Sequence, residues 1–437
     1  MSEKRFLLGK GHELTERIEY PRRHMDDKMF PYSPSEIFRR LTNDVKTTVL
    51  PYISGLPEQA CPDEKATALF TIHPSFIAKS YYPDHLFDER HLFALGCRPR
   101  KVIPQKIIRK QTPTKGKEEL ETIQYYISAK RDIFRQIADL TPNKMEPDWT
   151  SDFQKIERIT PLYGKDRVHA LCLTDKQSEP LLEIILHSGE DDRYIVKKFQ
   201  DYLRAIGLSP DIKHYPVSGL IYIPARIPKK KLTRLADFSF LRTIRPMPKL
   251  RQIELGLPVR SISTAQDCAM PKSKARDQAT KVAVFDTELP TEHALARWVK
   301  HFPIKGKSTG HLHGLQVTSA VLFGHIKDPN GLSTPPSNVC HHQVIIPEDE
   351  SDPDLYNVIN RILGHLKESR YEFANLSVGP DFPIEDDTIH YWTAKLDDYL
   401  SDGETFLTIA AGNNGDLDYD SGNARVQIPS DAVNAIS

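Results

Sequence analysis

The chain lacks any long apolar run. No stretch approaches the roughly 18 residues that a membrane-spanning helix needs. The first residues, Met1 to Lys10, contain no uninterrupted apolar segment of signal-peptide length. We therefore expect a cytoplasmic protein with no membrane partner.

The sequence also lacks net charge, because 59 Lys and Arg residues are matched by 59 Asp and Glu residues. Such a chain has no global field that would steer it toward nucleic acid or an anionic membrane. Two local basic stretches, 98–117 and 229–234, are typical of solvated faces. We expect no nucleic-acid partner.

Cysteine is scarce and unpatterned. The five cysteines are an odd number without CxxC spacing, which favours reduced structural thiols over disulfides or a zinc site. They are Cys61, Cys97, Cys172, Cys268 and Cys340. Cys340 is followed by His341 and His342, and adjacent strand residues point to opposite faces, so we interpret all three as structural.

The 437 residues predict two or three domains. Residues 281–437 alternate between strand-like and helix-like segments, which predicts an α/β fold with a doubly wound parallel sheet. The expected strands are 282–285, 343–346, 372–378 and 405–411, and the expected helices are 313–324, 351–366 and 387–400.

The upstream part has a different pattern. Residues 178–250 predict a ferredoxin-like α+β domain in βαββαβ order, although one strand of that order is not clear. A linker rich in Pro, Lys and Arg follows at 251–280. Residues 1–177 form an N-terminal region of unassigned fold. Its expected elements are a helix at 34–45 and strands at 67–72 and 123–127.

Two polar residues in the last region have the chemistry of an acid–base pair. Asp286 ends the apolar run 282–285, where a carboxylate can orient an imidazole, although a strand-terminal Asp is more often a cap or turn residue. His313 begins an expected helix, where a cation is disfavoured and a neutral, proton-accepting imidazole is favoured. His311 could form a metal pair with His313, but no third ligand lies nearby.

Four ordered motifs together resemble the subtilisin-like serine proteases, or subtilases. They are Val282-Ala-Val-Phe-Asp-Thr287, His313-Gly-Leu-Gln-Val-Thr-Ser-Ala320, Asn375-Leu-Ser-Val-Gly379 and Thr408-Ile-Ala-Ala-Gly-Asn-Asn-Gly415. The resemblance implies catalytic roles for Asp286, His313 as general base and Asn413 as oxyanion donor. It implies substrate binding by strand addition at Ser377, Val378 and Gly379. Asn414 and Gly415 fit an ordinary turn, and the 375–379 segment fits an ordinary strand and exit turn.

The chain departs from the family pattern in ways that leave a second hypothesis open. Glu288 replaces the usual Gly after Asp-Thr, Leu315 and Gln316 replace Thr-His, and Thr318 with Ser319 replaces Ala-Gly. These changes favour a catalytically inert subtilase-fold protein that binds or senses peptides. The first hypothesis is a serine endopeptidase acting on polypeptides.

The nucleophile segment of the family, Gly-Thr-Ser-x-Ala, does not occur in the sequence. Residues 427–437 resemble the strand that precedes it, so we expect the nucleophilic serine beyond Ser437 and an inactive fragment. Ser421 and Ser430 are the nearest alternatives, but neither is followed by a helix start.

The resemblance also carries implications for regulation. The 178–250 domain resembles the propeptide domain of subtilases, which assists folding and plugs the cleft, with release by cleavage in the linker. The extra N-terminal region is similar to that of intracellular bacterial subtilases paired with an AAA-type ATPase in phage defence, which implies such a partner. We expect no cofactor, while structural calcium stays open because subtilase calcium sites use dispersed oxygens.

Overall fold

The computed structural model describes residues 29–87, 92–109, 112–141, 146–170, 172, 177–189, 191–251, 269–307, 313–324, 331–346, 355–384, 387–413 and 425–437. These residues fall into two compact units. Unit 1 comprises the described residues of 248–384 and 389–437, and unit 2 those of 29–247 with 387 and 388. The molecule is thus mixed α/β.

Unit 1 is built on a five-stranded sheet in the order β12-β13-β11-β14-β15, with every pair parallel. Its strands are β11 (Asp277–Asp286), β12 (Val299–Phe302), β13 (Ser337–Gln343), β14 (Phe373–Leu376) and β15 (Phe406–Ile409). The chain leaves β11 toward β12 and leaves β14 toward β15. The carboxyl ends of β11 and β14 therefore flank a switch point, the usual place of a binding crevice in open α/β sheets.

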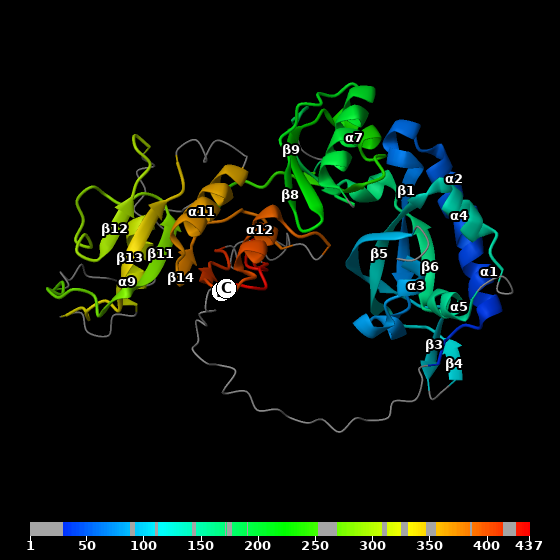
Figure 1. Cartoon of the computed structure of the whole chain (residues 1–437), viewed down its shortest axis with the longest axis horizontal. Helices are drawn as coiled ribbons and strands as arrows, with labels where there is room; N and C mark the ends of the chain where they lie inside the picture. Colours follow the sequence, from blue (N-terminus) through cyan, green and yellow to red (C-terminus); the bar gives the residue numbers. More distant parts are fainter. Residues whose placement is uncertain are drawn as a thin grey trace, which may run out of the picture. The chain divides into compact units, whose positions relative to one another are not determined.

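Helices cover both faces of this sheet, as expected from its runs of buried residues (Figure 1). Helix α9 (His313–Phe323) packs Leu322 against Val284 and Val339. On the other face, His365 of α11 (Tyr356–Ser369) lies over His342, with ring centroids 4.3 Å apart. Helix α12 (Tyr391–Leu400) packs beside α11.

The sequence predicted most elements of unit 1 within a few residues, but it missed β12 and misplaced two other elements. The strand expected at 343–346 lies earlier, in β13, where Cys340, His341 and His342 pair with β11. These polar residues concealed the strand because they do not form an apolar run. Helix α12 begins at Tyr391, four residues after the expected 387. The first residues of the helix expected at 351–366, 351–354, lie outside the described residues.

The described residues of unit 2 form two four-stranded antiparallel sheets and one two-stranded sheet. The first has the order β2-β5-β1-β6 and uses β1 (Lys65–Ile72), β2 (Phe93–Val102), β5 (Leu120–Lys130) and β6 (Ile156–Pro161). The helices of this part of the chain are α1 (Pro34–Asp44), α2 (Leu50–Gly55), α3 (Asp84–Phe87), α4 (Arg131–Ala138) and α5 (Pro147–Gln154). Strand β3 (Lys106–Arg109) pairs antiparallel with β4 (Thr112–Lys115).

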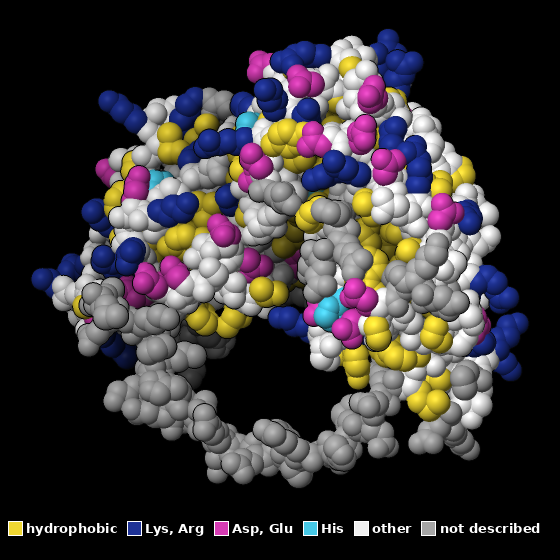
Figure 2. Space-filling view, turned by 45° about the vertical axis from the view of Figure 1, so that its right-hand side comes forward, with side chains coloured by type: hydrophobic (Ala, Val, Ile, Leu, Met, Phe, Trp, Pro, Cys, Tyr) yellow, Lys and Arg dark blue, Asp and Glu magenta, His cyan; other side chains and the backbone are white. Residues whose placement is uncertain are grey.

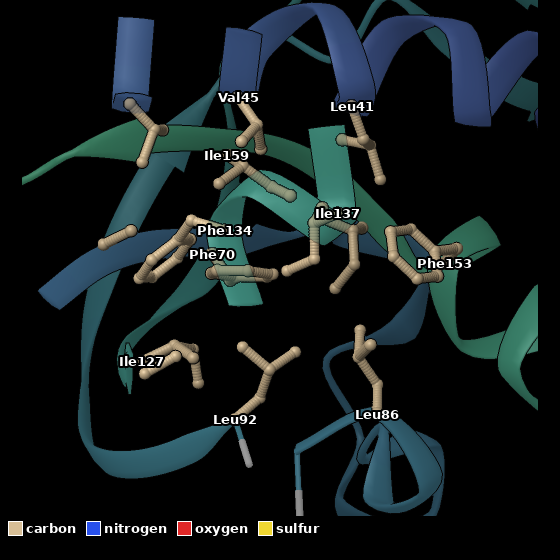
Figure 3. Close-up of a cluster of buried hydrophobic side chains, with 14 of the residues drawn as sticks. Leu41, Val45, Phe70, Leu86, Leu92, Ile127, Phe134, Ile137, Phe153 and Ile159 are labelled. Carbon is tan, nitrogen blue, oxygen red and sulfur yellow. The ribbon is translucent and has the colours of Figure 1, made fainter. Parts of the chain in front are cut away.

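The core of this first sheet explains why the predicted strands and helix form here. Figure 3 shows Leu41, at the buried side of α1, pointing toward Ile137 of α4, with Ile159 of β6, Phe70 of β1 and Phe134 of α4 in the same cluster. All five side chains are buried. The chain therefore forms an amphipathic helix at 34–44 and buries its apolar stripe on the sheet.

The second sheet of unit 2 has the order β10-β7-β9-β8. The chain runs through β7 (Leu181–His187), α7 (Asp192–Ala205), β8 (Tyr215–Val217), β9 (Leu220–Arg226), α8 (Leu232–Leu235) and β10 (Leu241–Pro246), which is the βαββαβ order. The strand that the sequence did not reveal is β8. It has only three residues and turns into β9 through Ser218 and Gly219, both with positive φ.

On the face shown in Figure 2, Lys and Arg side chains are interspersed with Asp and Glu, as the balanced composition leads one to expect. Within the described part of the chain, no helix is both long and apolar enough to cross a membrane. Cys61, Cys97, Cys172 and Cys340 are free thiols, and Cys268 lies outside the described residues.

Candidate active site

Asp286 and His313 form a hydrogen-bonded pair at the carboxyl edge of the unit 1 sheet. Asp286 is the last residue of β11 and is fully buried, and His313 opens α9. The distance from His313 Nδ1 to Asp286 Oδ1 is 2.7 Å. A carboxylate only accepts, so Nδ1 carries the hydrogen and Nε2 remains the proton-accepting nitrogen of the neutral ring. The structure thus brings together two residues that lie 27 positions apart.

The turn after β11 holds this pair in place. Thr287 donates its backbone N–H to Asp286 Oδ1 at 2.7 Å, and its Oγ1 accepts the backbone N–H of Gly314 at 2.9 Å. Only glycine fits at position 314, because there is no space for a side chain. A Cβ at this position would lie 2.6 Å from the Thr287 carbonyl oxygen and 2.9 Å from His341 Cε1. The helix start can therefore approach the strand end closely only with glycine at this position.

His341 stabilises the same turn through two hydrogen bonds. Its Nε2 donates to the Thr287 carbonyl at 2.7 Å, because a carbonyl can only accept, and its Nδ1 then accepts from the Thr318 hydroxyl at 2.8 Å. Both partners fix a neutral imidazole in this tautomer. His341 thereby links β13, the turn at Thr287 and the second turn of α9. Its structural role is as the sequence predicted.

The two histidines near Asp286 differ in their electrostatics. The hydrogen bond to Asp286 raises the pKa of His313 above its ordinary value, against an opposing effect of burial. Burial lowers the pKa of His341 to about 4. His313, with 27% of its side chain exposed, is the accessible and more basic of the two. Only His313 can exchange protons with a bound molecule near neutral pH.

Asn413 follows β15 at the same edge of the sheet, since all five strands are parallel. It is exposed, and it follows Gly412, whose φ of 113° and close approach to the Gln427 side chain both require glycine. A Cβ on Gly412 would lie 2.9 Å from Gln427 Cγ. Within the described residues no hydrogen bond joins Asn413 to Asp286 or His313. Asn414 and Gly415 lie outside those residues.

The predicted substrate segment leaves β14 beside the switch point. Ser377 donates to Asn375 Oδ1 at 2.8 Å, and Asn375 donates to Thr408 Oγ1 at 3.0 Å, which ties the segment to β15. Val378 is buried. The carbonyl of Gly379 accepts the backbone N–H of Arg251 at 2.8 Å, so part of this edge is already paired with the chain itself.

Neither alternative nucleophile is seen next to His313. Ser430 donates its hydroxyl to the Ala410 carbonyl at 3.0 Å. Ser421 lies outside the described residues, as does His311. No group of three or more His, Cys, Asp or Glu side chains that could hold a metal ion occurs in the described ranges. The question of structural calcium is unchanged by this finding, since backbone and amide oxygens also bind calcium.

No protein-family model and no curated protein matches the chain.

Sequence reasoning missed two contributors to this site. The role of Thr287 could have been inferred, because a Thr after a strand-terminal Asp can donate to the carboxylate and accept from a nearby helix start. Arg251 was assigned to the linker, and nothing in its local sequence indicates that it pairs with Gly379. That contact spans 128 residues and depends on the fold.

Proposed function

We propose that the chain carries most of the catalytic apparatus of a serine endopeptidase of the subtilase type. The observation that supports this most is the 2.7 Å hydrogen bond between His313 Nδ1 and Asp286 Oδ1 at the switch-point edge. The order Asp286, His313, Ser377 to Gly379 and Asn413 along the chain gives further support, as do the parallel strands that end at this edge. The finer subtilisin-like fold is part of the same proposal.

Each of the three residues has a defined role in the proposed reaction. As a serine hydroxyl attacks the peptide carbonyl carbon, its proton passes to His313 Nε2, and the Asp286 carboxylate stabilises the imidazolium that forms. The side-chain amide of Asn413 donates to the oxygen that becomes negative. The imidazolium then returns the proton to the leaving amine, and water repeats the sequence to release the acyl group. The proposal places the serine in sequence downstream of Ser437.

A fluorophosphonate probe tests this proposal, because it labels only an activated serine. The protein is expressed from coding sequence extended past Ser437 and compared with His313→Ala. We expect labelling that slows by at least about a hundredfold in this variant, the usual contribution of a general base. His214→Ala, at an exposed histidine of unit 2, serves as the matched control and should label normally. Absence of labelling in a folded extended protein would contradict the proposal.

The second candidate is an inert subtilase-fold protein that binds peptides. The observation that favours it is the environment of the two residues after Gly314. Leu315 packs into the apolar cluster beneath α9, and Gln316 is exposed on it. Neither residue supplies a polar group to the His313 imidazole. A folded extended protein that binds peptides without reacting with the probe would establish this function.

The proposal extends to the rest of the chain. The βαββαβ order of residues 181–246 supports a ferredoxin-like domain with a propeptide-like, inhibitory role. The substrate would be polypeptide, the location cytoplasmic and the partner an AAA-type ATPase. Co-purification of the tagged extended protein with such an ATPase, from cells that encode both, tests the partner.

A further inference from the structure

Three residues where the second sheet of unit 2 gives way to the predicted linker, 249–251, lie along the proposed substrate edge. The backbone N–H of Arg251 donates to the Gly379 carbonyl, and the N–H of Asp381 donates to the Lys249 carbonyl, each at 2.8 Å. Leu250 and Pro380 form an antiparallel bridge between these bonds. The segment 249–251 therefore adds to the edge in the way an extended peptide adds to an exposed strand.

The Arg251 side chain is buried in a pocket of this edge, with 8% of the residue exposed. Its guanidinium donates to the Ile428 carbonyl at 3.1 Å and to the Ala410 carbonyl at 3.5 Å. Gly379 forms one wall, and its hypothetical Cβ would lie 3.3 Å from the guanidinium. A long, planar, cationic side chain fits a pocket rimmed by carbonyl oxygens, because it presents several donors in a fixed fork.

The charge near the pocket also favours a cationic side chain. Asp381 attracts the guanidinium and counteracts the effect of burial, which lowers the pKa of Arg251. The fit is imperfect, because Arg251 Nε is buried without a hydrogen-bond partner among the described residues. A buried donor without a partner weakens the hold of the pocket on the segment, so a peptide that makes further contacts can displace it.

We propose that this pocket selects an arginine side chain of extended peptides, and that the segment 249–251 occupies it as an internal competitor. The inference rests on the proposed function, since it takes 377–379 as the substrate segment. It names the substrate class as polypeptides with an arginine in extended sequence. It also assigns the regulation of the site to displacement of three residues of the same chain.

Fluorescence anisotropy with a labelled peptide, Pro-Lys-Leu-Arg-Gln, tests the proposal on the chain itself. Arg251→Met removes the internal cation and retains an unbranched apolar side chain. We expect this variant to bind the peptide at least tenfold more tightly than the unmodified chain does. It should also prefer this peptide at least tenfold over the same peptide with Met in place of Arg.

One further variant and one further measurement keep the experiment decisive. Adding Gly379→Ala to the Met variant should abolish binding, because the new Cβ would lie 3.3 Å from the position of the guanidinium and 3.0 Å from the Ile428 carbonyl oxygen that binds it. If Arg251→Met is poorly folded, thermal unfolding provides the readout, and the Arg peptide but not the Met peptide should raise its melting temperature. Equal affinity for the two peptides, or equal binding by the unmodified chain and the variant, would overturn the proposal.

The outcome is separable from that of the protease proposal, because the binding measurement needs no catalytic residue. Arginine-selective binding in an extended protein that never reacts with fluorophosphonate would retain the pocket and reject the enzyme. An extended protein that reacts but shows no preference for arginine would retain the enzyme and reject the pocket.

Discussion

At the scale of single residues, the sequence predicted the pair Asp286 and His313. It predicted only some of the residues that position this pair. The motif around each residue identified it as a candidate. Because Asp286 ends a strand and His313 begins a helix, a hydrogen bond between them was a reasonable expectation. The side-chain role of Thr287 could be inferred from its place after Asp286, whereas the bonds of His341 to the Thr287 carbonyl and the Thr318 hydroxyl could not. Such contacts depend on the register of β13 against β11, which the sequence pattern misplaced.

Asp286→Asn should lower the pKa of His313, because the hydrogen bond to the carboxylate is the main cause of its elevation. An NMR titration of the imidazole measures this directly. Since the folded pKa is raised, the pair stabilises the fold fully below the unfolded value of about 6.5, and this contribution is lost as pH rises through the folded pKa. Asp201→Asn, at an exposed carboxylate of unit 2, should leave the titration unchanged.

Gly314→Ala should destabilise unit 1 by about 1 to 3 kcal/mol, because the added methyl group meets the Thr287 carbonyl and His341. Chemical denaturation measures the change. Gly364→Ala in α11 is the matched control, since nothing lies within 4 Å of its Cβ. Alanine should stabilise that helix by about 1 kcal/mol. Similar effects of both substitutions would show that the close approach at Gly314 is not needed.

At the scale of elements, buried apolar runs predicted β11, β14 and β15, and a clear apolar stripe predicted α11. The failures have physical causes. Strand β13 carries two buried histidines, of which His341 bonds Thr287 and Thr318 and His342 bonds Tyr371 through Nε2, so the burial of this strand is hidden in the sequence. The first sheet of unit 2 pairs strands far apart in sequence, such as β1 with β6, and local patterns do not specify such pairing.

The buried histidines of β13 should make unit 1 sensitive to acid. Burial lowers the pKa of His341 to about 4 and that of His342 to about 3. Both rings stay neutral in the folded state while the unfolded chain takes up protons below about pH 6.5. The free energy of unfolding should therefore fall as pH drops from 6.5 toward 4, by up to about 1.4 kcal/mol per pH unit for each ring.

Urea titrations at several pH values measure this slope. His342→Phe should reduce the slope by up to about 1.4 kcal/mol per pH unit, since one proton fewer is taken up on unfolding. Phenylalanine suits the site because the ring already stacks on Phe302 at 4.5 Å. His214→Gln, at an exposed histidine, should leave the slope unchanged. An unaltered slope in the Phe variant would contradict the assignment of His342 as buried and neutral.

At the scale of the whole molecule, each of the two units has its own core, and each should respond to core mutations by itself. Phe70→Ala should destabilise unit 2 by about 3 to 5 kcal/mol, because the ring is fully buried beneath α1. Hydrogen exchange measured by mass spectrometry should show faster exchange in β1, β5 and β6 and unchanged exchange in β11 and β14. Equal acceleration in both units would show that they unfold together.

The central claim is that His313, oriented by Asp286, acts as the general base for a serine. The most direct test is the pH dependence of the fluorophosphonate labelling rate of the extended protein, compared with the NMR titration of His313. The rate should rise with pH through the pKa of His313, because only the neutral imidazole accepts a proton, and Asp286→Asn should slow labelling and shift the profile to lower pH. A labelling rate that does not follow this titration would contradict the account.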